Sequence, residues 1–224
     1  YAIYAKHVLR LRPLDPLMRL PDALLRGIAI HEALEAFVEK TKADPSHLSV
    51  DAFLADIDTV LQEHVPWAEA RSLWRARMGR VAERFLSDEQ ERRALAYPNS
   101  LEVKGQSEIG HLGFTLIAKV DRIDIAPGGT LRIYDYKTGR PPSTDQQKYF
   151  DKQLLLTAAI AERDGFADLT PSEVEAAIYI SLASGGKDPP APIDEEPTRK
   201  VWAEFETLIE AYLGDETGYT SRRA

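Results

Sequence analysis

The sequence predicts an α/β domain in which a central sheet is flanked by helices and carries an added helical segment. Three observations support this fold class. Apolar residues recur at helical spacing through most of residues 22–93, three runs with strand character follow between residues 101 and 137, and helical and strand patterns then alternate. Patterns in this order are typical of a sheet covered by helices.

The first half of the chain is expected to be mainly helical. Residues 1–20 are apolar and basic, and prolines interrupt them before any long helix can form. Residues 22–40 have apolar positions at helical spacing, with Asp22 as the N-cap. Residues 50–93 contain two or three further amphipathic stretches with few helix breakers, and we interpret them as a helical insert.

Three strands are expected next. Residues 101–110 have the pattern of a short strand, and residues 113–125 have that of a longer one. The proline and two glycines within 126–130 are a strong turn signal. Residues 131–137 then form the third strand.

Two helices and one strand complete the pattern. Residues 138–147 are polar and proline-rich, which indicates a loop, and residues 148–163 continue at helical spacing. Residues 174–182 are predicted to be a strand with an apolar centre. After a loop rich in glycine, proline and acidic residues, residues 199–213 form the final helix.

Composition limits the class of protein. The 224 residues suffice for one domain and a little more, and the chain begins with Tyr1, so we interpret residues 1–224 as a single domain of a larger polypeptide. The absence of a long apolar run and of a signal-peptide pattern favours a soluble protein, and the absence of cysteine fits the reducing cytoplasm. The absence of cysteine excludes disulfides and an iron–sulfur cluster. The net charge of −8 argues against a broad basic face that binds nucleic acid unaided.

The turn at 126–130 sets the register of a hairpin. A three-residue loop at 127–129 offers two glycines for the left-handed position that such loops commonly need. In that register Asp121 lies directly opposite Asp135, with Cβ atoms about 5 Å apart on one face. Alternation along the strand places Lys137 on the same face. The sequence therefore predicts two carboxylates and an ammonium group at one end of a hairpin.

These three side chains have two interpretations. Like charges placed opposite each other are destabilising, and Mg²⁺ bound between one or two carboxylates and waters removes that repulsion. Lys137 could then orient an attacking water or stabilise the charge that develops on phosphorus. In the other interpretation, Asp121 and Asp135 are solvated residues at the edge of the sheet and Lys137 is their ion-pair partner.

Four motifs decide between these interpretations by resemblance. The stretches VDRID and IYDYKTG, with GIAIHEALE upstream and YFDKQLLL downstream, resemble the RecB-like branch of the PD-(D/E)XK nuclease superfamily in both content and order. The resemblance runs from about residue 25 to residue 182. It is closest to the nuclease domain of the B subunit of bacterial AddAB helicase–nucleases. The implied fold is a restriction-endonuclease-like core with a mixed central sheet, in which residues 101–182 are the catalytic core.

The resemblance implies a role for each matching residue. Asp121 and Asp135 match the metal ligands, and Lys137 matches the catalytic lysine. The backbone carbonyl of Tyr136 and the helical histidine, His31, are implied as further metal ligands. The glutamine of the following helix is matched by Gln153, which joins the catalytic set. We also expect Tyr149 to lie one turn before this glutamine on the same helix face.

The resemblance also implies cofactors and partners. Mg²⁺ is the expected metal, with Mn²⁺ as a possible substitute, and the missing cysteines mean that no iron–sulfur cluster is expected. The expected substrate is single-stranded DNA that a partner helicase produces during double-strand break repair. The chain has no phosphate-binding loop, so ATP hydrolysis would belong to the partner. Two alternatives stay open, a non-catalytic DNA-binding or scaffolding module, and a CRISPR-associated or phage exonuclease.

Other charged residues have simpler interpretations. Glu102 and Glu108, on the first strand, could approach the metals but are left out of the core set, and Asp124 is expected to face away from the site. Arg77, Arg80 and Arg84 form one helical stripe. A solvated face is the leading interpretation of this stripe. The alternative is a contact line for the DNA backbone, with Trp74 available for base stacking.

Overall fold

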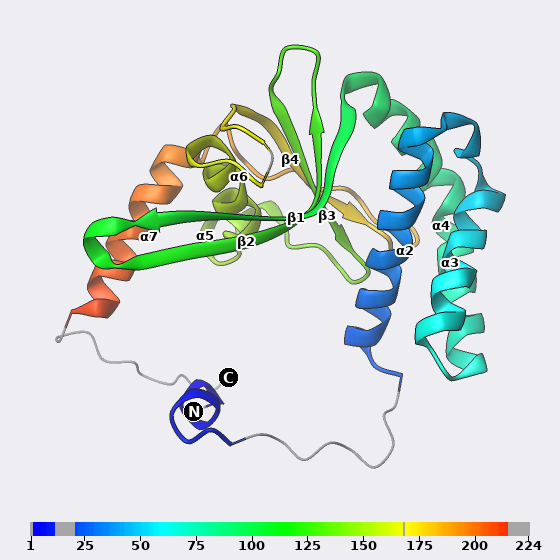
Figure 1. Cartoon of the computed structure of the whole chain (residues 1–224), viewed down its shortest axis with the longest axis horizontal. Coiled ribbons are helices and arrows are strands. Elements are labelled where there is room, and N and C mark those ends of the chain that lie inside the picture. The colour runs from blue at the N-terminus through cyan, green and yellow to red at the C-terminus, as the bar shows by residue number, and fades with distance from the viewer. Residues whose placement is uncertain (1, 12–20, 168, 215–224) are drawn as a thin grey trace.

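The structure is a computed structural model that describes residues 2–11, 21–167 and 169–214. Its centre is a four-stranded mixed sheet in the order β1-β2-β3-β4 (Figure 1). The second strand runs antiparallel to both the first and the third, and the fourth runs parallel to the third. The strands are β1 (Tyr97–Ile109), β2 (Phe114–Ile125), β3 (Leu131–Lys137) and β4 (Val174–Ser181).

Helices cover both faces of the sheet, which confirms the expected α/β class and its mixed sheet (Figure 1). Three long helices pack together on one face, and two helices pack on the other. The described helices are α1 (Ala2–His7), α2 (Ala23–Ala43), α3 (Val50–His64), α4 (Ala68–Leu95), α5 (Thr144–Tyr149), α6 (Gln153–Arg163) and α7 (Thr198–Leu213). Two short 3₁₀ helices, η1 (Pro45–His47) and η2 (Gly110–Leu112), join longer elements. None of the helices described combines the length and the apolar character needed to cross a membrane.

The two faces of the sheet enclose two separate apolar cores. Tyr134 and Tyr136 belong to the core formed with α2, α3 and α4, whereas Ile133 belongs to the core formed with α6 and α7. This division follows the alternation of side chains along β3. The rings of Phe37, Phe53 and Phe85 pack against one another within the first core. The strand that carries Asp135 and Lys137 is therefore supported from both sides.

Several local predictions are confirmed. Asp22 caps α2, because its Oδ1 accepts a hydrogen bond of 2.7 Å from the backbone N–H of Leu25. The β2–β3 hairpin has the expected register, in which Ile123 pairs with Ile133. Its loop places Gly129 at φ +86°, the left-handed conformation that glycine adopts without a Cβ penalty. The turn residues thus set the register of the hairpin that was expected to assemble the site.

The connection after β3 differs from the prediction. Residues 138–147 were expected to be a loop and residues 148–163 one helix, but α5 begins at Thr144 and α6 begins only at Gln153. Ser143 and Gln146 form a capping box that starts α5, and this Ser-x-x-Gln signal is present in the sequence. Tyr149 consequently ends α5 instead of lying on the helix of Gln153, and the expectation that they share one helix face is wrong.

Candidate active site

The β2–β3 hairpin brings the three central residues together. The paired register extends to Arg122 and Tyr134, one position before Asp121 and Asp135. An oxygen of Asp121, Oδ2, accepts a hydrogen bond of 2.7 Å from the backbone N–H of Tyr136. Lys137 Nζ lies 2.6 Å from Asp135 Oδ2. The two carboxylates and the ammonium group therefore meet at the end of the hairpin, as its register predicts.

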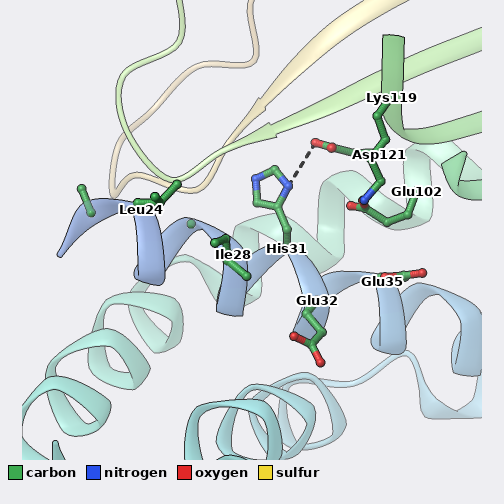
Figure 2. Close-up of a pocket in the computed structure, with 10 residues that line it drawn as sticks. Leu24, Ile28, His31, Glu32, Glu35, Glu102, Lys119 and Asp121 are labelled. Atoms are coloured by element: carbon green, nitrogen blue, oxygen red, sulfur yellow. Dashed lines mark ion pairs between the residues drawn. The ribbon is translucent and has the colours of Figure 1, made fainter. Parts of the chain in front are cut away.

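Two helices add the other matched residues. From α2, His31 places Nδ1 3.4 Å from Asp121 Oδ2, as Figure 2 shows with a dashed line. From the first turn of α6, Gln153 Nε2 donates a hydrogen bond of 3.1 Å to Asp135 Oδ1. Residues far apart in the sequence thus converge on one end of the hairpin.

A third carboxylate, Glu102, belongs to this cluster although the sequence-based set omitted it. One ligand atom each from His31, Glu102 and Asp121 lies within 4.8 Å of the others, which is close enough for one metal ion. Glu102 lies between Leu101 and Val103, which pair with the two neighbours of Asp121, so the two carboxylates are opposite each other. The signal that could have indicated Glu102 is the register of the β1–β2 hairpin, but its positive φ lies outside the pattern of a regular strand.

The backbone of Glu102 is strained. Its φ is +51°, a left-handed conformation that a side chain with a Cβ seldom adopts. Such strain costs about 1–3 kcal/mol and clusters at functional sites. The conformation lies beside a register shift between Pro98 and Ser100, which interrupts the pairing of β1.

Burial and nearby charges shift the pKa values of two residues of the site, Asp135 and His31. Burial, with the charge of Asp121 second, raises the pKa of Asp135 to about 6. Burial by itself lowers the pKa of His31, but the hydrogen bond and charge of Asp121 and the charges of Asp135 and Glu102 outweigh it and raise that pKa above its ordinary value. The side chains together therefore hold more negative charge than Lys137 compensates.

These residues fit a divalent cation. Asp135 Oδ2 is buried and forms an ion pair of 2.6 Å with the ammonium group of Lys137. Carboxylate oxygens suit Mg²⁺ and Mn²⁺, and an imidazole nitrogen is a common further ligand for transition metals. His31, Glu102 and Asp121 could hold such an ion, with Asp135 beside them.

The cluster lies in a hollow between α2 and the strands. We call it the acidic hollow, and it is lined by Leu24, Ile28, His31, Glu35, Glu102 and Asp121, among others (Figure 2). Lys119 forms an ion pair with Glu102 at the rim of this cluster.

A buried charge network lies behind the site and contains Asp124. The carboxylate of Asp124 accepts two hydrogen bonds of 2.6 Å from Arg122, whose other nitrogen binds Glu89 of α4 at 2.8 Å. Arg122 also donates to the hydroxyl of Tyr136 at 3.4 Å. Asp124 therefore pairs away from the cluster, as expected, and the network ties β2 to α4.

The three arginines of the α4 stripe differ in exposure. Arg77 and Arg80 are exposed, as a solvated face requires. Arg84 is half-buried and pairs with Asp88 at 3.1 Å and with the carbonyl of Ser181, so its place in a DNA contact line is not supported. Trp74 is 5% exposed within the first core, and the suggestion that it stacks on bases is wrong.

Glu108 is exposed at the η2 end of β1, opposite Thr115, and does not join the cluster.

Comparison with known proteins supplies a family. A family model described as the PD-(D/E)XK nuclease superfamily matches residues 1–220. A protein of Rickettsia bellii described as uncharacterized is 26% identical over 170 residues, which cover 74% of this chain and 20% of the relative. A similarly described protein of Rickettsia typhi is 25% identical over 192 residues, covering 83% of this chain and 22% of the relative. The chain thus spans about a fifth of the length of the curated relatives it matches.

Proposed function

Because the chain belongs to the PD-(D/E)XK nuclease superfamily, we propose that it is a metal-dependent nuclease that hydrolyses DNA phosphodiester bonds at Asp121, Asp135 and Lys137. The observation that carries the proposal is the convergence of these side chains with His31 and Gln153 from two different helices. A solvated edge pair would not need a buried aspartate held by both a lysine and a glutamine.

Each side chain has a role that follows from its position. Asp121, His31 and Glu102 would hold Mg²⁺, or Mn²⁺ as a substitute, with the carbonyl of Tyr136 as a further ligand. The bound ion would polarise a phosphoryl oxygen and lower the pKa of water.

The contacts of Lys137 and Gln153 with Asp135 position the groups that act on the attacking water. The ammonium group of Lys137, beside Asp135, orients the attacking water and stabilises negative charge that develops on phosphorus. Gln153 fixes the carboxylate of Asp135 through its hydrogen bond, so the carboxylate cannot rotate away from the lysine.

The finer assignment is a nuclease domain of a helicase–nuclease in the cytoplasm that degrades single-stranded DNA during double-strand break repair. Its support is the resemblance of four motifs in order, together with the net charge of −8. An acidic chain binds a polyanion weakly unless a partner supplies affinity. A helicase that feeds the strand to this domain would supply it.

Cleavage of labelled single-stranded DNA in Mg²⁺ or Mn²⁺ tests the proposal. Lys137→Ala should abolish cutting, and Lys200→Ala, which removes an exposed lysine of α7 paired with Glu196, should not. Cutting that needs no metal, or that survives in Lys137→Ala, would contradict the assigned chemistry. If the wild type binds DNA and does not cut it in metal, even with its helicase partner, the chain is a non-catalytic module that keeps the fold.

A further inference from the structure

A second hollow adjoins the candidate active site. Lys137 and Gln153 line it, and both contact Asp135. The loop after β3 and the short break between α5 and α6 form its other walls, which include Arg140 and Phe150. We call it the cationic groove. The hairpin carboxylates therefore lie between two hollows, with Asp121 in the acidic one and Lys137 in the other.

The two hollows have opposite charge. Four carboxylates and one lysine line the acidic hollow, whereas three cationic side chains and one carboxylate line the cationic groove. Lys152 is paired with Glu196 at 2.9 Å, but Arg140 makes no ion pair with any residue that the structure describes. Such a division suits a nucleic acid strand, whose metal-bound phosphate needs carboxylates nearby and whose next phosphate needs a cation.

An unusual exposed ring stands in the cationic groove. Phe150 is 88% exposed, the largest fraction among the large apolar side chains that the structure describes as exposed. Its ring makes no aromatic contact within the described part of the chain. A phenylalanine ring has no polar atom that gains from water, and the open face of Phe150 beside the site is available to stack on an unpaired base.

We propose that the cationic groove binds the nucleotide next to the scissile bond of a single-stranded substrate, with its unpaired base stacked on Phe150 and its phosphate held by Arg140. The proposal rests on the nuclease function above and adds a substrate subsite to it. Base faces are accessible only in a strand that is not paired and stacked in a duplex. The break between α5 and α6, which the sequence did not indicate, places this ring beside the site.

Binding without cleavage tests the stacking contact. Fluorescence anisotropy in EDTA would measure the dissociation constants of the 224-residue chain for a single-stranded oligodeoxynucleotide and for an abasic strand of the same length. Phe150→Ala should weaken binding of the base-bearing strand by roughly 5- to 150-fold and leave the abasic strand unaffected. Phe150→Trp should restore the affinity. Ile117→Ala removes another exposed apolar side chain, which lines neither hollow, and should change nothing.

Arg140→Ala separates the phosphate contact from the base contact. It should weaken binding of both strands equally and reduce the dependence of affinity on salt. Unchanged affinity in Phe150→Ala, or an equal loss on the abasic strand, would overturn the base-stacking subsite.

A cleavage arm distinguishes failure of the groove from failure of the function. Metal-dependent cutting by the wild type with no effect of Phe150→Ala on affinity would reject the subsite and keep the nuclease. If the wild type neither binds nor cuts any strand, even with its helicase partner present, both proposals fall. RNA of the same sequence identifies the polymer, because a ring-dependent affinity for RNA alone would keep the groove and overturn the choice of DNA.

Discussion

Replacement of Arg122 by methionine should strongly destabilise the fold. The Arg122 side chain is fully buried and binds Asp124 twice at 2.6 Å and Glu89 at 2.9 and 2.8 Å. Methionine fills similar space but provides no positive charge. The contact with Tyr136 would also be lost, so the change reaches the strand that carries the active site.

The size of the effect depends on which ion-pair partners each carboxylate retains after the substitution. Glu89 retains Arg92 at 3.0 Å and Arg93 at 2.7 Å, whereas Asp124 loses its side-chain hydrogen bonds and stays buried. Leaving one member of a buried ion pair without its partner costs about 3–5 kcal/mol. That is a large part of the roughly 5–15 kcal/mol that stabilises a typical domain.

Urea unfolding followed by circular dichroism measures this loss. With a slope of about 3 kcal/mol per molar urea, the midpoint should fall by roughly 1–1.7 M. Arg75→Met is the matched control, since Arg75 pairs with Asp58 at 2.8 Å on the surface, and it should cost no more than about 1 kcal/mol. Adding Asp124→Asn to Arg122→Met should recover part of the loss by removing the unpaired charge. Equal losses in the two arginine variants would refute the stabilising role of the network.

Three further predictions concern stability and metal binding. Burial alone raises the pKa of Glu89, but the neighbouring arginines outweigh burial and lower this pKa from 4.5 to about 2. Roughly 3 kcal/mol of stability, fully present above pH 4.5, should therefore be lost as the pH falls toward 2. The midpoint of urea unfolding should depend less on pH in Glu89→Gln than in the wild type. Gly105→Ala should cost about 1–3 kcal/mol, because a Cβ there would lie 2.5 Å from the buried ring of Phe166, whereas Gly128→Ala, with open space around it, should be neutral in thermal melts. Glu102→Gln should weaken Mn²⁺ binding in calorimetry by roughly 10-fold or more, and an unchanged affinity would exclude it as a ligand.

The sequence predicted the part of the site that depends on local turn chemistry. The three-residue loop with Gly129 determines the register of β2 and β3, and this register alone is enough to bring Asp121, Asp135 and Lys137 together. The helices that frame the sheet were also predictable, since their apolar spacing and the N-cap Asp22 are local signals.

The missed features depend on contacts between distant segments or on backbone irregularity. Glu102 joins the cluster through the pairing of β1 with β2 and through its positive φ, which alternation along a regular strand does not predict. Trp74 and Arg84 have the spacing of a surface stripe, but Trp74 is buried in the core formed with α2, α3 and α4, and Arg84 is half-buried. Helical spacing likewise concealed the break before Gln153, because the capping box at Ser143 marks only where α5 begins.

The most direct test of the central claim is to locate Mn²⁺ in crystals of the chain by anomalous scattering. The proposed function predicts an ion coordinated by Asp121, with His31, Glu102 or Asp135 completing the ligand set, and its loss in Asp121→Asn. Manganese bound only elsewhere on the chain, or retained unchanged in Asp121→Asn, would contradict the assignment of this hairpin as the metal-dependent catalytic centre.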